Sequence, residues 1–289
     1  MAHLERLSRK AGKDWTADDL DGLNIQVVCE NLKEFFSGNP ELPRVPPAIP
    51  QELLSANPAK PPDVHASREL PQTARDFLVH LADSMPHHGT QGLIAGFAHF
   101  VLDLIGFRGD MVERVVLQRH TVRFRMDGSD VIASPACCLM KRTSPAHMHM
   151  LFVEVHKESS SAFNAVARLV ADAIGGFQHN NTVRRMRAEA ERKAETFVGV
   201  VFVFASPTFY KITVTQKLSE AVKKGMYLEE MTIVEQFVPP VPRPETFDDE
   251  GMKDVNNRAY LFRCFEACRY LVVSERGTFI LAGGVPPYQ

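Results

Sequence analysis

The chain has 289 residues, a formal net charge of −2 and 24% charged residues. This length allows one large domain with a buried core, and the near-neutral charge excludes a uniformly basic nucleic-acid coat, so nucleic-acid binding needs a local basic patch. No apolar run reaches the roughly 18 residues of a membrane span, and the first residues lack the apolar core of a signal peptide. The odd number of cysteines favours reduced thiols, so we expect an intracellular protein, cytoplasmic or nuclear, without a membrane partner.

The first 72 residues predict an N-terminal arm. Apolar residues recur at helical spacing over 16–37, and Thr16 followed by Asp19 is typical of a capping box, so we expect a helix there. Proline recurs throughout 38–72, which excludes helices and paired strands and predicts an extended segment that wraps over the surface.

The middle of the chain alternates between helical and strand patterns. Helices are expected at 73–85, 90–107, 161–181, 218–225 and 256–273. Strands are expected at 112–126, 129–142, 149–157, 196–206, 209–216 and 231–238. The turn Asp127–Gly128 separates the first two strands as in a hairpin.

This order predicts an α/β (α+β) fold with a central mixed sheet and helical additions at both ends. Its core has the order helix, strand, strand, strand, helix, strand. We expect three regions: an N-terminal helix with a Pro-rich arm at 1–72, the α/β core at 73–238, and a Pro-rich segment with a C-terminal helix packed on the core at 239–289.

Several short sequence segments resemble those of known proteins. They are FQHNN at 177–181, SPTFYKITVT at 206–215, GMKDVNNR at 251–258, CFEACRYLV at 264–272, DWTADDLDGLNI at 14–25 and FFSGNPELP at 35–43. In these segments the chain resembles a group of basidiomycete fungal proteins related to the PD-(D/E)XK, or restriction-endonuclease-like, nucleases. The resemblance implies a nuclease-like α-β-β-β-α-β core. It also implies a Glu-x-Lys motif at the end of strand 149–157 and an aspartate on strand 129–142, which together bind Mg²⁺ or Mn²⁺.

The matching positions lack both metal-binding carboxylates. Lys157 matches the family lysine, but Val155 stands where the glutamate belongs and Ala136 where the aspartate belongs. Glu154 has the opposite strand parity to Lys157, so only a β-bulge brings it to the same face. We therefore predict a catalytically degenerate nuclease fold without a cofactor, which binds nucleic acid, another polyanion or a protein partner through the former active-site cleft. A homodimer is a further expectation.

Basic and polar residues around that cleft are the predicted ligand contacts. They are Arg119, Arg123, Arg125, Gln178, Asn180, Asn181 and Lys211. The three arginines share one face of strand 112–126 and suit bidentate phosphate contacts, although the same pattern is typical of a solvent-facing or protected edge strand. The amides at the end of helix 161–181 either support the site or cap the helix.

Two alternatives keep the cleft but change its chemistry. In the first, Glu154 with Asp130 or Asp127 forms a relocated metal site of an active Mg²⁺- or Mn²⁺-dependent nuclease. In the second, an enzyme of another class, for example in fungal secondary metabolism, uses Lys157, Tyr210 and His156 as acid and base groups. His147 and His149 share a strand face as a metal pair would, but no third ligand lies nearby in the sequence.

Overall fold

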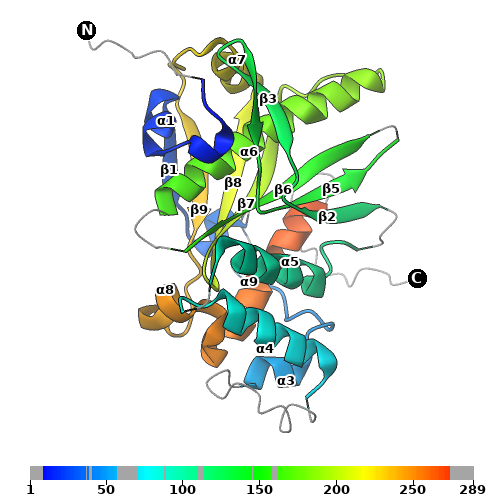
Figure 1. Ribbon diagram of the computed structural model, residues 1–289, viewed down its shortest axis with the longest axis vertical. Helices are drawn as coiled ribbons and strands as arrows, with labels where there is room; N and C mark the ends of the chain where they lie inside the picture. Colours follow the sequence, from blue (N-terminus) through cyan, green and yellow to red (C-terminus); the bar gives the residue numbers. More distant parts are fainter. Residues whose placement is uncertain are drawn as a thin grey trace.

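A seven-stranded mixed sheet forms the centre of the molecule in the computed structural model, in the order β1-β9-β8-β7-β6-β5-β2, with a separate β3–β4 hairpin (Figure 1). The structure describes residues 9–36, 38, 41–56, 70–87, 89–109, 113–144, 146–157 and 162–273. The strands are β1 (Ile25–Cys29), β2 (Arg114–Gln118), β3 (Val122–Met126), β4 (Ser129–Ala133), β5 (Cys137–Arg142), β6 (His147–His156), β7 (Ala194–Val203), β8 (Ser206–Thr215) and β9 (Thr232–Phe237). The predicted α/β fold with a mixed sheet is confirmed.

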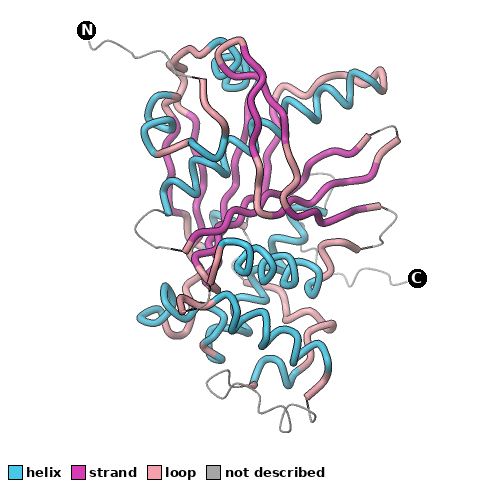
Figure 2. Tube along the Cα trace, viewed as in Figure 1, coloured by secondary structure: helices cyan, strands magenta, loops and turns pink. Residues whose placement is uncertain are grey.

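Helices cover both faces of this sheet, which confirms the predicted helical additions (Figure 2). They are α1 (Ala17–Gly22), α2 (Leu32–Phe35), α3 (Gln51–Ser55), α4 (Gln72–Ser84), α5 (Gln91–Ile105), α6 (Ala162–Met186), α7 (Gln216–Lys224), α8 (Phe247–Glu250) and α9 (Val255–Val273). One core lies under α4, α5 and α9, and the other lies under α1, α6, α7 and the hairpin. Within the described parts of the chain, no helix is long and apolar enough to cross a membrane.

The prediction of one helix at 16–37 is wrong. The capping box does form, since the backbone N–H of Thr16 donates to the Asp19 carboxylate at 2.6 Å, but α1 then ends at Gly22. Asn24 follows with a left-handed φ of 53°, and the chain leaves the helix to form β1. Parallel pairing of β1 with β9 outweighs the helical spacing of its apolar residues.

The two long strands expected at 112–126 and 129–142 each divide in two. Arg119, with a φ of 50°, turns the chain from β2 in the main sheet to β3 in the hairpin. Residues 134–136 carry it back from β4 to β5. The remaining helices and strands of the core occur where they were expected, except that α6 continues to Met186 and not 181. The prediction that 38–72 holds no helix is wrong, since α3 forms directly after Pro50, which is compatible with the start of a helix, and buries Leu53.

An extra residue in β6 changes which side chains face α6. Leu139 of β5 lies opposite Leu151, but the next residue, Met140, lies opposite His149, so Met150 is inserted as a β-bulge. The bulge brings His149 to the α6 side of the sheet, where its ring stacks on Phe152 with centroids 5.4 Å apart. The sequence contains no signal for a bulge at this position.

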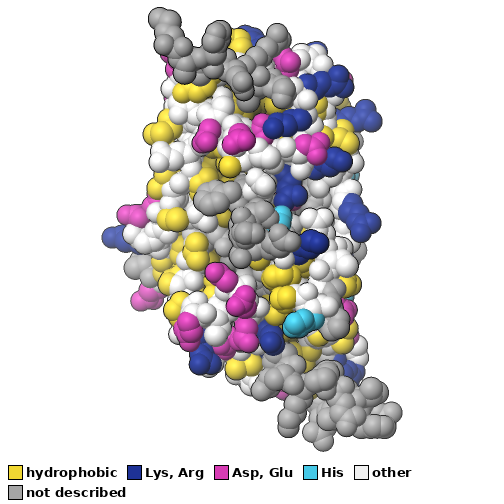
Figure 3. Space-filling model, turned by 60° about the vertical axis from the view of Figure 1, so that its left-hand side comes forward, with side chains coloured by type: hydrophobic (Ala, Val, Ile, Leu, Met, Phe, Trp, Pro, Cys, Tyr) yellow, Lys and Arg dark blue, Asp and Glu magenta, His cyan; other side chains and the backbone are white. Residues whose placement is uncertain are grey.

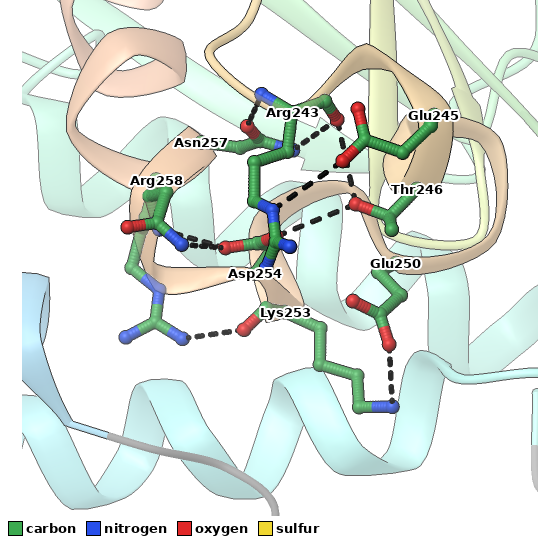
Figure 4. A network of polar contacts seen from close by, with 9 residues as sticks. Arg243, Glu245, Thr246, Glu250, Lys253, Asp254, Asn257 and Arg258 are labelled. Carbon is green, nitrogen blue, oxygen red and sulfur yellow. Dashed lines mark hydrogen bonds and ion pairs between the residues drawn. The ribbon is translucent and has the colours of Figure 1, made fainter.

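Helix α9 fixes the Pro-rich segment to the core through a buried arginine. The Arg258 guanidinium is fully buried and donates to the carbonyls of Leu53 at 2.6 Å and Ala56 at 2.8 Å. It also donates to the carbonyls of Met252 and Lys253, and the latter bond is drawn in Figure 4. Four hydrogen bonds from one side chain thus hold two distant segments together.

Candidate ligand-binding site

A pocket of about 380 Å³ opens where β2 and β6 end and β5 begins. Its exposed residues are Lys13, Gln91, Gly92, Arg119 and Ser134. Its deeper residues are Gly12, Ala95, Pro135, Ala136, Glu154, Val155, Arg168 and Asp172. The pocket therefore has a cationic mouth and an acidic floor.

The floor consists of two carboxyl groups in contact. Glu154 and Asp172 are 7% and 1% exposed, and their carboxyl groups hydrogen-bond to each other. The backbone N–H of Ala136 donates to Glu154, and Nε of Arg168 lies 3.9 Å from its Oε2. Asp172 Oδ2 is buried and has no hydrogen-bond partner among the described residues. One carboxylate oxygen of the floor is thus buried without a hydrogen-bond partner among the described residues.

Burial disfavours a double negative charge on this pair. It raises the pKa of Glu154 to about 7, against the opposing effect of Arg168. Burial, followed by the charge of Glu154, raises the pKa of Asp172 well above its usual range. Burial therefore disfavours the state in which both carboxyl groups are ionised.

Strand alternation and helix periodicity bring the floor together. Glu154 and Phe152 are two residues apart on β6 and both face α6, whereas Val155 lies in the opposite core. Arg168 and Asp172 are four residues apart on α6 and so share one face of the helix. The bulge in β6 lies upstream of Glu154, so it does not bring Glu154 to the face of Lys157.

Two cationic residues reach the mouth because of local backbone features. Gly92, in the first turn of α5, leaves space for Arg119: a Cβ at this position would lie 3.3 Å from its Nη2 atom. Gly12 packs so tightly that a Cβ there would lie 2.8 Å from Cβ of Ala133, and this close approach places Lys13 at the mouth. The N-terminus of the 15-residue helix α5 adds backbone N–H groups beside them.

Most of the predicted catalytic residues lie elsewhere. Lys157 is exposed beyond the end of β6 and is not among the described residues that line the pocket. Tyr210 is buried, and its hydroxyl accepts a hydrogen bond from Gln236 at 3.1 Å, while burial raises its pKa. His156, at the end of β6, is half-buried and likewise outside the pocket lining.

The aspartates of the relocated metal site do not meet Glu154. Asp130 is exposed on β4, with its carboxylate 3.8 Å from Nε of Arg125. Asp127 lies at the tip of the β3–β4 hairpin, and its backbone N–H donates to Val222 of α7. The carboxylate that joins Glu154 is Asp172, which the sequence reasoning missed.

The expected three-arginine stripe does not form. Arg123 and Arg125 do share the exposed face of β3, but Arg119 lies in the turn before it and lines the pocket. The stripe fails because residues 112–126 are two strands separated by a turn. Lys211 lies far along the sheet on β8, where it pairs with Glu235 and lies over the Phe35 ring.

The three amide side chains of α6 hydrogen-bond to backbone groups of neighbouring segments. Gln178 accepts from the N–H of Arg125 at 2.8 Å, and Asn181 accepts from the N–H of Arg192 at 2.9 Å. Asn180 bonds the backbone of His149. None of the three ends the helix, since α6 continues to Met186, so the expectation of a C-terminal cap is wrong.

Three histidine rings lie close together beside the bulge in β6. The His149 ring lies 5.4 Å from the His120 ring and 4.7 Å from the His179 ring, centroid to centroid, and burial lowers its pKa to about 3. Both of its ring nitrogens are buried without a partner among the described residues. In the part of the chain that the structure describes, no group of three or more His, Cys, Asp or Glu residues is arranged to hold a metal ion.

Comparison with known proteins assigns no family. No family model matches the chain, and no curated protein matches its sequence. The resemblance to PD-(D/E)XK nucleases and to basidiomycete proteins therefore stays a prediction, and the pocket is the basis for a functional proposal.

Proposed function

We propose that the chain binds a phosphate-bearing ligand, with nucleic acid as the expected class, through the pocket above Glu154 and Asp172. The observation that carries this proposal is the combination of Lys13, Arg119 and the α5 N-terminus at one exposed mouth. A guanidinium, an ammonium and free helical N–H groups are the donors that proteins use for phosphate.

The position of the pocket supports a degenerate nuclease fold as part of this proposal. Helix α5, strands β2, β5 and β6, helix α6 and strand β7 occur in the predicted order, with the β3–β4 hairpin inserted between β2 and β5, and β6 and β7 pair in parallel. Ala136 and Val155, the two positions where the resemblance implies metal-binding carboxylates, both line the pocket. An apolar pair at these positions favours ligand binding without the family's metal chemistry.

The charge distribution fits local binding. Acidic and basic side chains both occur on the face drawn in Figure 3, as expected for a chain with a net charge of −2. The described cysteines are unpaired thiols, which suits the reducing interior of a cell. We therefore propose an intracellular protein that attracts its ligand through the pocket mouth.

Binding of a fluorescein-labelled single-stranded oligonucleotide, followed by anisotropy with inorganic phosphate as competitor, tests this proposal. Arg119→Asn removes the guanidinium and keeps a residue that tolerates the left-handed backbone, so we expect at least tenfold weaker binding. Arg123→Asn is the matched control, because it makes the same charge change on the exposed face of β3. Equal losses in both variants, or no binding by the native protein, would refute the proposal.

A metal-dependent phosphodiesterase is the second candidate, favoured by the contact between Glu154 and Asp172. Mg²⁺ often binds through one or two carboxylates with waters and substrate phosphates as its other ligands. Arg168 already lies beside Glu154, and burial disfavours the state in which both carboxyls are ionised, so the residues fit a metal poorly. Cleavage of DNA or RNA in Mn²⁺ that Asp172→Asn abolishes would establish this candidate.

A further inference from the structure

We propose that the open edge of β1 is a docking site for a protein partner, which adds an extended peptide segment as a further strand of the main sheet. The segment that fits has apolar residues in its middle and Lys or Arg at both ends. The residues that line this site are distinct from those that line the pocket of the proposed function.

The edge of β1 offers backbone groups without partners. In the described sheet, β1 is a terminal strand and pairs with β9 alone. The carbonyl of Asn24 accepts from β9 and the N–H of Glu30 donates to it, so the even-numbered residues between them also point toward β9. The backbone groups of Ile25, Val27 and Cys29 therefore point away from the sheet, where no described residue bonds them.

Strand β1 lacks the features that protect many edge strands. Natural edge strands often carry Lys, Pro or a β-bulge, which prevents pairing with another chain. The five residues Ile25–Cys29 contain no charged residue and no proline, and their register with β9 is unbroken. An edge of this kind is a template for β-strand addition, in which a partner's peptide bonds the free backbone groups.

A groove of about 490 Å³ lies beside this edge, between α1 and β1. Leu20, Ile25 and Val27 give it an apolar lining, and Met231, which is 53% exposed, borders it. Figure 3 turns this side of the molecule forward and shows patches of hydrophobic side chains on it. Because side chains alternate along a strand, every second residue of an added strand would enter the groove. The groove therefore favours apolar residues in the middle of the segment.

Acidic side chains lie at both ends of the β1 edge. Asp21 lines the groove, and Glu229 lies beside the start of β1, since its carbonyl accepts from the side-chain amide of Asn24 at 3.0 Å. At the other end, the hydrogen bond between Glu30 and Glu34, followed by desolvation and nearby negative charge, raises the pKa of Glu30. Lys or Arg at the two ends of the segment would complement these carboxyl groups.

The same charges disfavour a second copy of the chain as the occupant. Antiparallel pairing of two β1 strands about Val27 would place Glu30 of one copy opposite Asn24 of the other, next to Glu229. Parallel pairing in register would place the two copies of Glu30 side by side. Both arrangements bring like charges together, which destabilises strand pairing.

Fluorescence anisotropy with two labelled peptides tests the proposal on the native protein. The peptide KTVTVTK has Lys at both ends of a β-branched middle, and ETVTVTE is its matched control with the opposite charge. We expect KTVTVTK to bind at least tenfold more tightly, with a difference that shrinks in high salt. Equal affinities, or no binding of KTVTVTK at about 1 mM, would overturn the proposal.

A proline variant then places the peptide at the β1 edge. Val27→Pro removes an outward N–H and no bond to β9, so the fold should be kept and KTVTVTK should bind at least tenfold more weakly. Gln118→Pro is the control at the opposite edge of the sheet, where the N–H of Gln118 points away from β5 because its neighbour Arg119 donates to Ala136. Circular dichroism establishes that both variants are folded, and native-like binding by folded Val27→Pro would contradict the assignment.

Two further measurements identify other occupants. Sedimentation equilibrium that shows a dimer of the native protein and a monomer of Val27→Pro would assign the edge to a second copy. Peptide binding that appears only after removal of residues 1–8 would assign the groove to that segment of the chain. Either result would overturn the proposal of a protein partner.

Discussion

The side-chain amide of Asn180 bonds both backbone groups of His149, accepting from its N–H at 2.8 Å and donating to its carbonyl at 3.0 Å. Asn180 is fully buried on α6, and His149 lies next to the bulge in β6. Because a bulge leaves backbone groups without a ladder partner, the amide replaces the missing strand contacts. The helix therefore stabilises an irregularity of the strand that it covers.

Replacing this amide should destabilise the fold. Asn180→Leu leaves the His149 N–H and carbonyl without partners, so we expect a loss of about 2–4 kcal/mol in the free energy of unfolding. Urea denaturation measures this change. Gln178→Leu on the same helix is the control, because Gln178 bonds the exposed strand β3 and should cost about 1 kcal/mol or less. Equal losses would contradict the role given to Asn180.

The buried guanidinium of Arg258 predicts a second large loss. Arg258→Met keeps much of the packing against Phe77 but removes donors to four carbonyls, so we expect about 3 kcal/mol or more of destabilisation. Arg243→Met is the control, since Arg243 is half exposed and its ion pairs contribute at most about 1 kcal/mol. Chemical denaturation of both variants decides the matter: a stable Arg258→Met protein would show that the carbonyls find other partners.

The raised pKa of Glu154 predicts a stability that falls as the pH rises. Its folded pKa of about 7 lies above the ordinary value of 4.5, so the folded state holds a proton that the unfolded chain has released in this window. The contribution of Glu154 to the free energy of unfolding should therefore decrease from pH 4.5 to 7, by up to about 3 kcal/mol. Glu154→Gln should flatten this part of the profile, whereas Asp130→Asn should not. An unchanged slope in Glu154→Gln would refute the raised pKa.

The lowered pKa of His149 predicts a contribution to stability with the opposite pH dependence, which is lost at acidic pH. Burial lowers its pKa from 6.5 to about 3, so the unfolded chain binds the proton that the folded state excludes. The contribution of His149 to stability is then complete above pH 6.5 and falls as the pH decreases, by about 2 kcal/mol at pH 5. His149→Phe should remove this loss while keeping the contact with Phe152. Thermal unfolding at pH 5 and pH 7 measures it, and a native-like acid loss in the variant would assign the effect to another group.

The long helices could be predicted from the sequence because their pattern is local. Apolar periodicity located α4, α5 and α9 within a few residues. It failed at 16–37, since Ile25 and Val27 also match helical spacing and only pairing with β9, more than 200 residues away, makes them a strand. The bulge at Met150 depends in the same way on Asn180, on another element.

The acidic floor of the pocket was only half predicted. Glu154 was identified from its strand, but Asp172 belongs to a helix 18 residues later and carries no motif. A signal did exist: Asp172 stands within the apolar run from Val170 to Ile174, on a helix segment that is apolar all round. A carboxylate in such a run must be buried, and buried carboxylates have partners or altered pKa values. Arg168, one helical turn earlier, carries the same signal.

Because β1 pairs with β9, the central sheet can be completed only late in the synthesis of the chain. Ile25 leaves the ribosome early, but its partner Thr232 follows about 200 residues later, which takes about 10–40 s at typical elongation rates. The carbonyls of Leu53 and Ala56 acquire their hydrogen bonds from Arg258 later still, because Arg258 follows them by more than 200 residues. Strand β1 and the Arg258 contacts of Leu53 and Ala56 therefore form only when nearly the whole chain has emerged, whereas α1 packs earlier on α6. Docking of this segment is expected to be the last and slowest step of folding, and the one most open to assistance by chaperones.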